Sequence, residues 1–174
     1  MEDNKDYREI SIQEAVSDLT NLLSEKGLDY TVHTQNDEGY DYLDDEECRS
    51  INMVNKSGDE LFIDLQGEFT IFFQEWHEHY YTEKWDYDKL KNDLLDLLSN
   101  KLFVFTVMCN NEWMCSVLVR DSQISKEEVK QKVRKYLNHP EFRNKLKING
   151  ADICFKFWDD KLNKKIIFKP GEIK

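Results

Sequence analysis

Pairs of β-rich runs, each pair separated by only a few turn-forming residues, constrain the fold of this chain most. Alternating or strongly apolar patterns rich in β-formers are typical of strands. Strands joined by such short turns cannot be parallel, because a parallel crossover needs about a dozen residues or more. The sequence therefore predicts antiparallel hairpins. Three pairs have this character: residues 49–55 and 60–66 around KSGD, 102–110 and 112–120 meeting at Asn110 and Asn111, and 151–159 and 164–169 around DKLN.

Three other stretches repeat their apolar residues with the period of a helix. They cover about residues 11–26, 86–100 and 125–137. The first and the third open on a serine with a glutamate three residues later, which is the capping-box pattern of a helix N-terminus. Gly27 gives the first helix a natural end. A short strand is predicted at 29–34.

Together these segments predict an α+β protein, with three helices packed against one antiparallel sheet of about six to eight strands. A chain of 174 residues fits one domain of ordinary size and can bury a proper core. No long linker, internal repeat or low-complexity segment interrupts it. We therefore expect a single globular domain over residues 1–174.

Residues 67–85, GEFTIFFQEWHEHYYTEKW, form the most unusual stretch of the chain. Its first part is strongly apolar, and aromatic, acidic and histidine side chains follow directly. The pattern indicates one central strand from 68 to about 80, buried on both faces, that leaves the core at Glu75. The rim beyond this point would carry two sets of side chains on opposite faces: Trp76, Glu78 and Tyr80 on one, and Glu75, His77 and His79 on the other.

Glu75, His77 and His79 are a candidate metal site. Because alternate residues of a strand point the same way, the carboxylate and the two imidazoles could converge on zinc or iron. A zinc site usually has four protein ligands, or three and a water, so a distant side chain would have to approach. The alternative is a polar strand end that packs with neighbouring aromatic residues. We expect no cofactor, and a small metal-dependent hydrolase at this site is the alternative function.

Charge is distributed unevenly along the chain. Residues 1–100 hold 26 acidic and 8 basic side chains, whereas residues 101–174 hold 9 acidic and 16 basic ones. The acidic segment, residues 37–47 with the sequence DEGYDYLDDEE, places seven carboxylates around two tyrosines and one leucine. Such a surface repels nucleic-acid phosphates and attracts basic proteins. It is either a solvated loop or an interface in which charges steer a partner and aromatic side chains anchor it.

Several function classes lack their sequence signatures. The chain has no glycine-rich phosphate loop and no GxSxG, HExxH or CxxC motif, so we expect a protein that is not an enzyme. The lysine-rich helix face at 126–135 is expected to be solvated and not to bind nucleic acid. No apolar run approaches the roughly 20 residues of a membrane span, and the charged N-terminus is unlike a signal peptide. We expect a cytoplasmic protein with no membrane partner and with its four cysteines as buried free thiols.

The layout of the chain carries a family resemblance over about residues 60–120. The run GEFTIFFQEWHEHYY, a short helix and the hairpin LFVFTVMCNNEWMCSVLV follow one another there. This arrangement resembles the immunity-type proteins that accompany bacterial polymorphic and contact-dependent toxins. The resemblance implies a single-domain cytoplasmic protein, often acidic, that binds one cognate toxin domain and blocks it.

Two classes of function are therefore open, an inhibitor of a toxin protein and a metal-dependent hydrolase. For the inhibitor the partner is expected to be a basic protein. Metal analysis of the purified protein separates the two classes, because the hydrolase requires about one bound metal ion per chain. The expected partner-binding residues of the inhibitor come from the acidic segment and from the strand rim: Asp41, Tyr42, Asp44, Asp45, Glu46, Glu47, Trp76, Glu78 and Tyr80.

Overall fold

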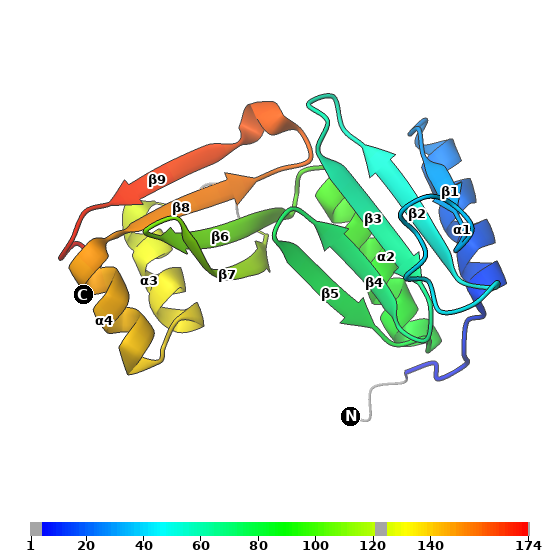
Figure 1. Cartoon of the computed structure of the whole chain (residues 1–174), viewed down its shortest axis with the longest axis horizontal. Coiled ribbons are helices and arrows are strands. Elements are labelled where there is room, and N and C mark those ends of the chain that lie inside the picture. The colour runs from blue at the N-terminus through cyan, green and yellow to red at the C-terminus, as the bar shows by residue number, and fades with distance from the viewer. Residues whose placement is uncertain (1–4, 121–124, 174) are drawn as a thin grey trace. The chain divides into compact units, whose positions relative to one another are not determined.

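The computed structural model describes residues 5–120 and 125–173, and the chain divides into two compact units. The N-terminal unit is Met1–Leu95 and the C-terminal unit is Asp96–Lys174. Figure 1 colours the first from blue to green and the second from green to red. The expectation of a single domain over residues 1–174 stays a prediction, because compactness alone does not establish independent folding.

In the N-terminal unit one five-stranded antiparallel sheet carries the fold. Its strands follow the chain in the order β1-β2-β3-β4-β5, so that every neighbouring pair is sequential. Helix α2 continues past the unit boundary to Leu98. The elements are α1 (Ile12–Glu25), β1 (Thr31–His33), β2 (Arg49–Val54), β3 (Glu60–Leu65), β4 (Phe69–Phe73), β5 (Trp76–Tyr80) and α2 (Lys84–Leu98).

Both helices pack on the same face of this sheet. Tyr87 of α2 meets Phe69 of β4 edge-on, with 6.0 Å between the ring centroids, and its hydroxyl donates to Asp18 of α1 at 3.0 Å. Figure 1 shows α2 behind strands β3 and β4. The opposite face, the open face, lacks this cover. It carries the alternate residues of β2 to β5: Ser50, Asn52, Phe62, Asp64, Thr70, Phe72, His77 and His79.

The expected continuous strand from 68 to 80 is wrong. The chain reverses at Gln74 and Glu75, and Phe73 of β4 pairs directly with Trp76 of β5. Gln74 adopts a φ of 56°, which a tight hairpin turn requires but which glutamine does not signal. Strand β4 is therefore next to the edge and β5 is the edge strand. One face of β4 is fully buried, whereas Phe72 on its open face is only half-buried.

The C-terminal unit contains a four-stranded antiparallel sheet in the order β7-β6-β8-β9. Its helix α4 is not foreseen by the sequence pattern, which ends the third helix before Pro140. Proline occupies the first turn of α4, where its missing N–H costs nothing, and it opens this helix. The elements are β6 (Phe103–Cys109), β7 (Glu112–Val119), α3 (Lys126–Tyr136), α4 (Pro140–Asn149), β8 (Ala151–Lys156), the 3-10 turn η1 (Asp160–Leu162) and β9 (Lys164–Phe168).

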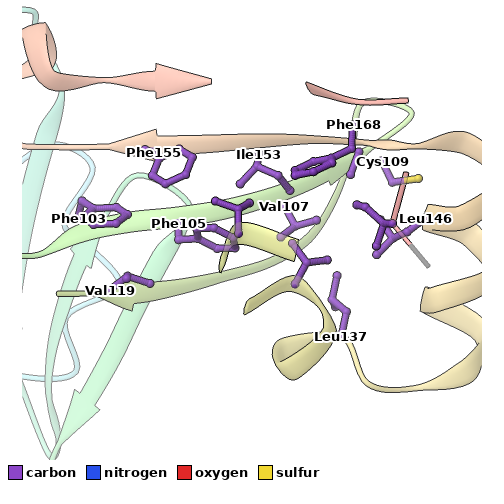
Figure 2. Close-up of a cluster of buried hydrophobic side chains, with 14 of the residues drawn as sticks. Phe103, Phe105, Val107, Cys109, Val119, Leu137, Leu146, Ile153, Phe155 and Phe168 are labelled. Atoms are coloured by element: carbon purple, nitrogen blue, oxygen red, sulfur yellow. The ribbon is translucent and has the colours of Figure 1, made fainter. Parts of the chain in front are cut away.

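Five phenylalanines lie in the apolar core of the C-terminal unit. The ring of Phe103 stacks on those of Phe155 and Phe157, at centroid distances of 5.5 and 4.7 Å. Figure 2 shows residues of β6 and β8 gathered in one cluster with Leu137 and Leu146 from the helical side. All of these side chains are buried, so the sheet and its two helices share one apolar core.

The α+β class and the antiparallel pairing are confirmed. The three expected hairpins form, Asn110 and Asn111 both have positive φ, and the capping boxes at Ser11 and Ser125 are complete. The strands form two sheets, where one was expected, and among the described residues no strand of β1 to β5 pairs with a strand of β6 to β9. Within residues 5–120 and 125–173 there are nine strands and four α-helices, against the expected six to eight and three. No helix in these residues is long and apolar enough to cross a bilayer.

Candidate functional site

The acidic segment is a folded chain of turns between β1 and β2. Near its start, Asp37 accepts hydrogen bonds from the N–H and the hydroxyl of Thr34, and these bonds lower the pKa of its carboxyl group. Near its end, Asp45 accepts the N–H groups of Glu47 and Cys48 at 2.8 and 3.1 Å, which lowers its pKa in the same way. Leu43 is buried between them. The backbone that carries the carboxylates is therefore fixed.

Two tyrosines attach the acidic segment to the open face of the sheet. Tyr40 stacks on His33, with 4.0 Å between the ring centroids and 6° between the planes. The hydroxyl of Tyr42 donates to Asp64 at 3.1 Å, and Ser50 donates to the same oxygen at 2.6 Å. Asp64 is only 5% exposed, whereas Tyr42 is 49% exposed. Burial raises the pKa of Tyr42 to about 12 and also raises the pKa of Asp64.

The raised pKa of Asp64 predicts that the stability of the protein depends on pH. Its folded pKa lies above the unfolded value of about 3.9, so the folded protein binds more protons between these two values. The contribution of Asp64 to the free energy of unfolding must then fall as the pH rises through this window. Asn at this position keeps an acceptor oxygen for Tyr42 and Ser50 but does not titrate.

We therefore expect the stability of Asp64→Asn, relative to the unchanged protein, to increase with pH across this window. Urea unfolding at several values from about pH 3.5 to about pH 7 measures this difference. Asp64→Ala, which leaves both hydroxyls without their acceptor, should be less stable than Asp64→Asn at every pH. If the difference in free energy of unfolding between the unchanged protein and Asp64→Asn does not change with pH, the raised pKa of Asp64 is contradicted.

A polar row crosses all five strands of the open face. Strand register places His33 beside Ser50, Ser50 beside Asp64, Asp64 beside Thr70, and Thr70 beside His79. At its outer end the Thr70 hydroxyl lies 3.0 Å from Nδ1 of His79. Pattern reasoning missed this row because it depends on register between strands. The one local signal was a carboxylate, Asp64, within the apolar run ELFIDLQ.

The strand rim does not expose its aromatic residues. Trp76 is 5% exposed and Tyr80 is 1% exposed, and the Tyr80 hydroxyl donates to Asp93 of α2 at 3.1 Å. The expectation that both form a contact surface is therefore wrong: the hairpin turns them toward the helices. Glu78 is exposed and lies 3.5 Å from Lys89. The predicted residues of the acidic segment are all exposed: Asp41, Tyr42, Asp44, Asp45, Glu46 and Glu47.

The arrangement that suggested a metal site does not form. Glu75 belongs to the turn between β4 and β5, so it does not alternate with the histidines on one strand. His77 and His79 lie on the exposed edge strand with 5.3 Å between their ring centroids, and His79 lies 3.6 Å from Glu68. In the part of the chain that the structure describes, no group of three or more His, Cys, Asp or Glu residues could hold a metal ion.

The cysteines are free thiols, as expected, but only two of them are fully buried. Cys48 and Cys109 are buried, whereas Cys115 and Cys154 are half-buried. Burial raises the pKa of Cys115 to about 11 and raises those of Cys48 and Cys109 as well. Thiols with raised pKa values are weak nucleophiles, so these three do not suit nucleophilic catalysis.

A surface groove of about 550 Å³ borders the end of the acidic segment. Helix α1 forms one wall with the residues of its first turns, and the chain that enters β2 forms the other. Sequence reasoning could not foresee this groove, because its walls are more than 25 residues apart in the chain. The lining residues are Ile12, Gln13, Val16, Ser17, Glu46, Glu47 and Arg49.

The acidic segment, with Tyr42 on the open face of the sheet and the groove on the α1 side of β2, is the candidate binding region of the N-terminal unit. Its chemistry suits the recognition of a basic protein, because carboxylates surround an exposed aromatic ring and a partly apolar groove. Comparisons with protein-family models, with curated proteins and with solved structures find no match for this chain.

Proposed function

We propose that this protein is an immunity-type inhibitor that binds a basic toxin domain through the acidic segment and thereby blocks it. The observation that carries this proposal is a fixed array of exposed carboxylates that, among the described residues, form no ion pair with a lysine or an arginine. The array surrounds Tyr42, whose ring is half exposed while its hydroxyl is held by Asp64. The resemblance of residues 60–120 to immunity-type proteins supports the same class of function.

Unpaired negative charge is concentrated on the acidic segment. Elsewhere in the N-terminal unit some exposed carboxylates pair with lysines, as in the pairs Lys91 with Asp18 and Lys84 with Asp88. Among the described residues, no lysine or arginine forms an ion pair with a carboxylate of residues 37–47. Residues 1–95 as a whole hold 25 acidic and 8 basic side chains. The field of this unit therefore attracts a basic partner and directs it toward the segment.

Tyr42 suits the role of an anchor within this field. Its hydrogen bond to Asp64 fixes the side chain before any partner arrives, so that binding costs little conformational entropy. Aromatic side chains that become fully covered at the centre of an interface contribute most of its affinity. The carboxylates are then expected to set the association rate of the partner. Tyr42 is expected to set its dissociation rate.

The test measures binding to a basic toxin domain, sought among the products of neighbouring genes, and asks whether coexpression protects cells from it. Between low salt and about 0.5 M salt the association rate should fall about tenfold or more, with little change in the dissociation rate. Neutralising Asp44, Asp45, Glu46 and Glu47 to the matching amides should cause much of the same loss. Tyr42→Ala should instead raise the dissociation rate.

A matched control distinguishes the effect of where the charges lie from the effect of the net charge on the association rate. Amides at four exposed carboxylates elsewhere on the unit change the net charge equally, and they should slow association much less. The proposal fails if the control amides slow association as much as the amides in the acidic segment do. It also fails if coexpression gives the cells no protection. The control positions are Glu9, Glu25, Asp29 and Glu60.

A further inference from the structure

The groove beside the acidic segment combines apolar and acidic walls. Ile12 and Val16 of α1 are half-buried and leave part of their apolar surface open to it. Glu46 and Glu47 on the opposite wall are exposed. Within the described chain, neither of their carboxylates forms a hydrogen bond or an ion pair. The groove therefore offers an apolar strip and two unneutralised charges to the same ligand.

Arg49 also lines the groove, and among the described residues it forms no ion pair with Glu46 or Glu47. Its Nη1 donates to the backbone carbonyl oxygens of Glu46 and Cys48, at 2.5 and 2.7 Å. These bonds hold the guanidinium against the main chain at the base of the segment. Arg49 remains a cation in these bonds, but in the part of the chain that the structure describes it forms no ion pair with Glu46 or Glu47, so both carboxylates can still pair with a cation from outside.

Both walls of the groove are fixed before a ligand binds. The capping box at Ser11 sets the first turn of α1: its N–H donates to Glu14 at 2.9 Å, and its hydroxyl accepts from the N–H of Glu14 at 3.2 Å. On the other side, Asp45 fixes the backbone of Glu47. A groove with rigid walls loses little entropy when it is filled, which favours its use as a binding site.

We infer that this groove is the subsite that receives a long basic side chain, arginine or lysine, of the protein partner. The inference rests on the proposed function and adds the site at which a side chain of the partner binds. The aliphatic part of such a side chain would lie on Ile12 and Val16 while its charged end reaches Glu46 and Glu47. An acidic side chain would be repelled there, and a purely apolar one would leave both carboxylates without a counter-charge.

The experiment uses the complete protein and the peptide acetyl-hexaarginine amide as the probe, with acetyl-hexalysine amide and acetyl-hexacitrulline amide in parallel. Backbone amide shifts in NMR titrations locate the bound peptide and give its Kd. The two cationic peptides should shift the amides of Ile12, Val16, Glu46 and Glu47 in a saturable way. The uncharged citrulline peptide should not, since it keeps the length but lacks the charge.

Two pairs of variants test whether the groove itself is needed. Glu46→Gln with Glu47→Gln should weaken binding about fivefold or more, whereas the same charge change at Asp41 and Asp44 on the same segment should have less than half that effect. Ser17→Phe, which fills the groove without changing charge, should weaken binding to a similar degree. Asn21→Phe, one turn further along α1, adds the same side chain outside the groove and should leave binding unchanged.

The inference is overturned if the two neutralised pairs weaken binding equally and Ser17→Phe has no effect, because charge alone would then hold the peptide. It is also overturned if no saturable shifts occur at the groove residues. Neither outcome decides the proposed function, which depends on association with the toxin and on protection of cells. Conversely, groove binding with no effect of the acidic segment on toxin association would overturn the proposed function alone.

Discussion

Replacing Gly150 by alanine is expected to destabilise the C-terminal unit by about 4 kcal/mol, the sum of backbone strain and a steric clash. Gly150 ends helix α4 with φ 78° and ψ −168°, a region that is almost exclusive to glycine. A Cβ atom at this position would lie well inside van der Waals contact of the Phe168 carbonyl oxygen. Because that oxygen belongs to the backbone of β9, it cannot move without disturbing the pairing of β8 with β9.

Gly171→Ala is the matched control for this prediction. Gly171 also lies in the C-terminal unit and has a φ of 80°, but a Cβ there would meet nothing within 4 Å. The control should therefore show the conformational penalty alone, about 1 kcal/mol. Thermal and urea unfolding measure both variants. If both variants lose the same free energy of unfolding, the close approach of the Phe168 carbonyl oxygen to residue 150 contributes nothing to the loss.

Phe73→Ala is expected to lower the free energy of unfolding by about 3 to 5 kcal/mol through the cavity that it leaves. Phe73 is 1% exposed and belongs to the helix-covered face of β4. The pattern of the sequence predicts an equal loss for Phe72, but Phe72 points to the open face and is half-buried. On that face its ring lies near the rings of Phe62 and His77, with centroid distances of 6.3 and 5.6 Å.

Phe72→Ala serves as the internal comparison and should cost about 1 kcal/mol. Both variants remove the same side chain from the same strand, so differences in β-propensity cancel between them. Chemical denaturation with a common m-value gives the two losses directly. If Phe72→Ala is as destabilising as Phe73→Ala, both faces of β4 are buried and the assignment of the open face is wrong.

Local chemistry is sufficient to predict the parts of this fold that depend on neighbouring residues. A serine and a glutamate three residues apart satisfy backbone N–H groups within one helical turn, so Ser11 and Ser125 mark two helix starts. Asparagine tolerates positive φ, so Asn110 and Asn111 mark a hairpin. The acidic segment is found in the same way, because its charge and its aromatic residues are contiguous in the sequence.

The turn at Gln74 and Glu75 shows where local chemistry fails. Neither residue favours positive φ, and the apolar pattern continues across the turn because Phe73 and Trp76 are cross-strand neighbours on one face. The reversal places both rings on the helix-covered face of the sheet, where both are buried, and burial of this face favours the hairpin. The same reversal removes Glu75 from the histidines and takes Trp76 and Tyr80 away from the surface.

The sequence by itself determined the α+β class, the antiparallel hairpins and the place of the acidic segment, because each depends on residues close together in the chain. Only the tertiary structure decided that the strands form two sheets, that Asp64 lies buried beneath Tyr42, and that α1 and the acidic segment enclose a groove. These features join residues that are 20 or more positions apart. Their geometry depends on strand register and helix packing, which no local pattern encodes.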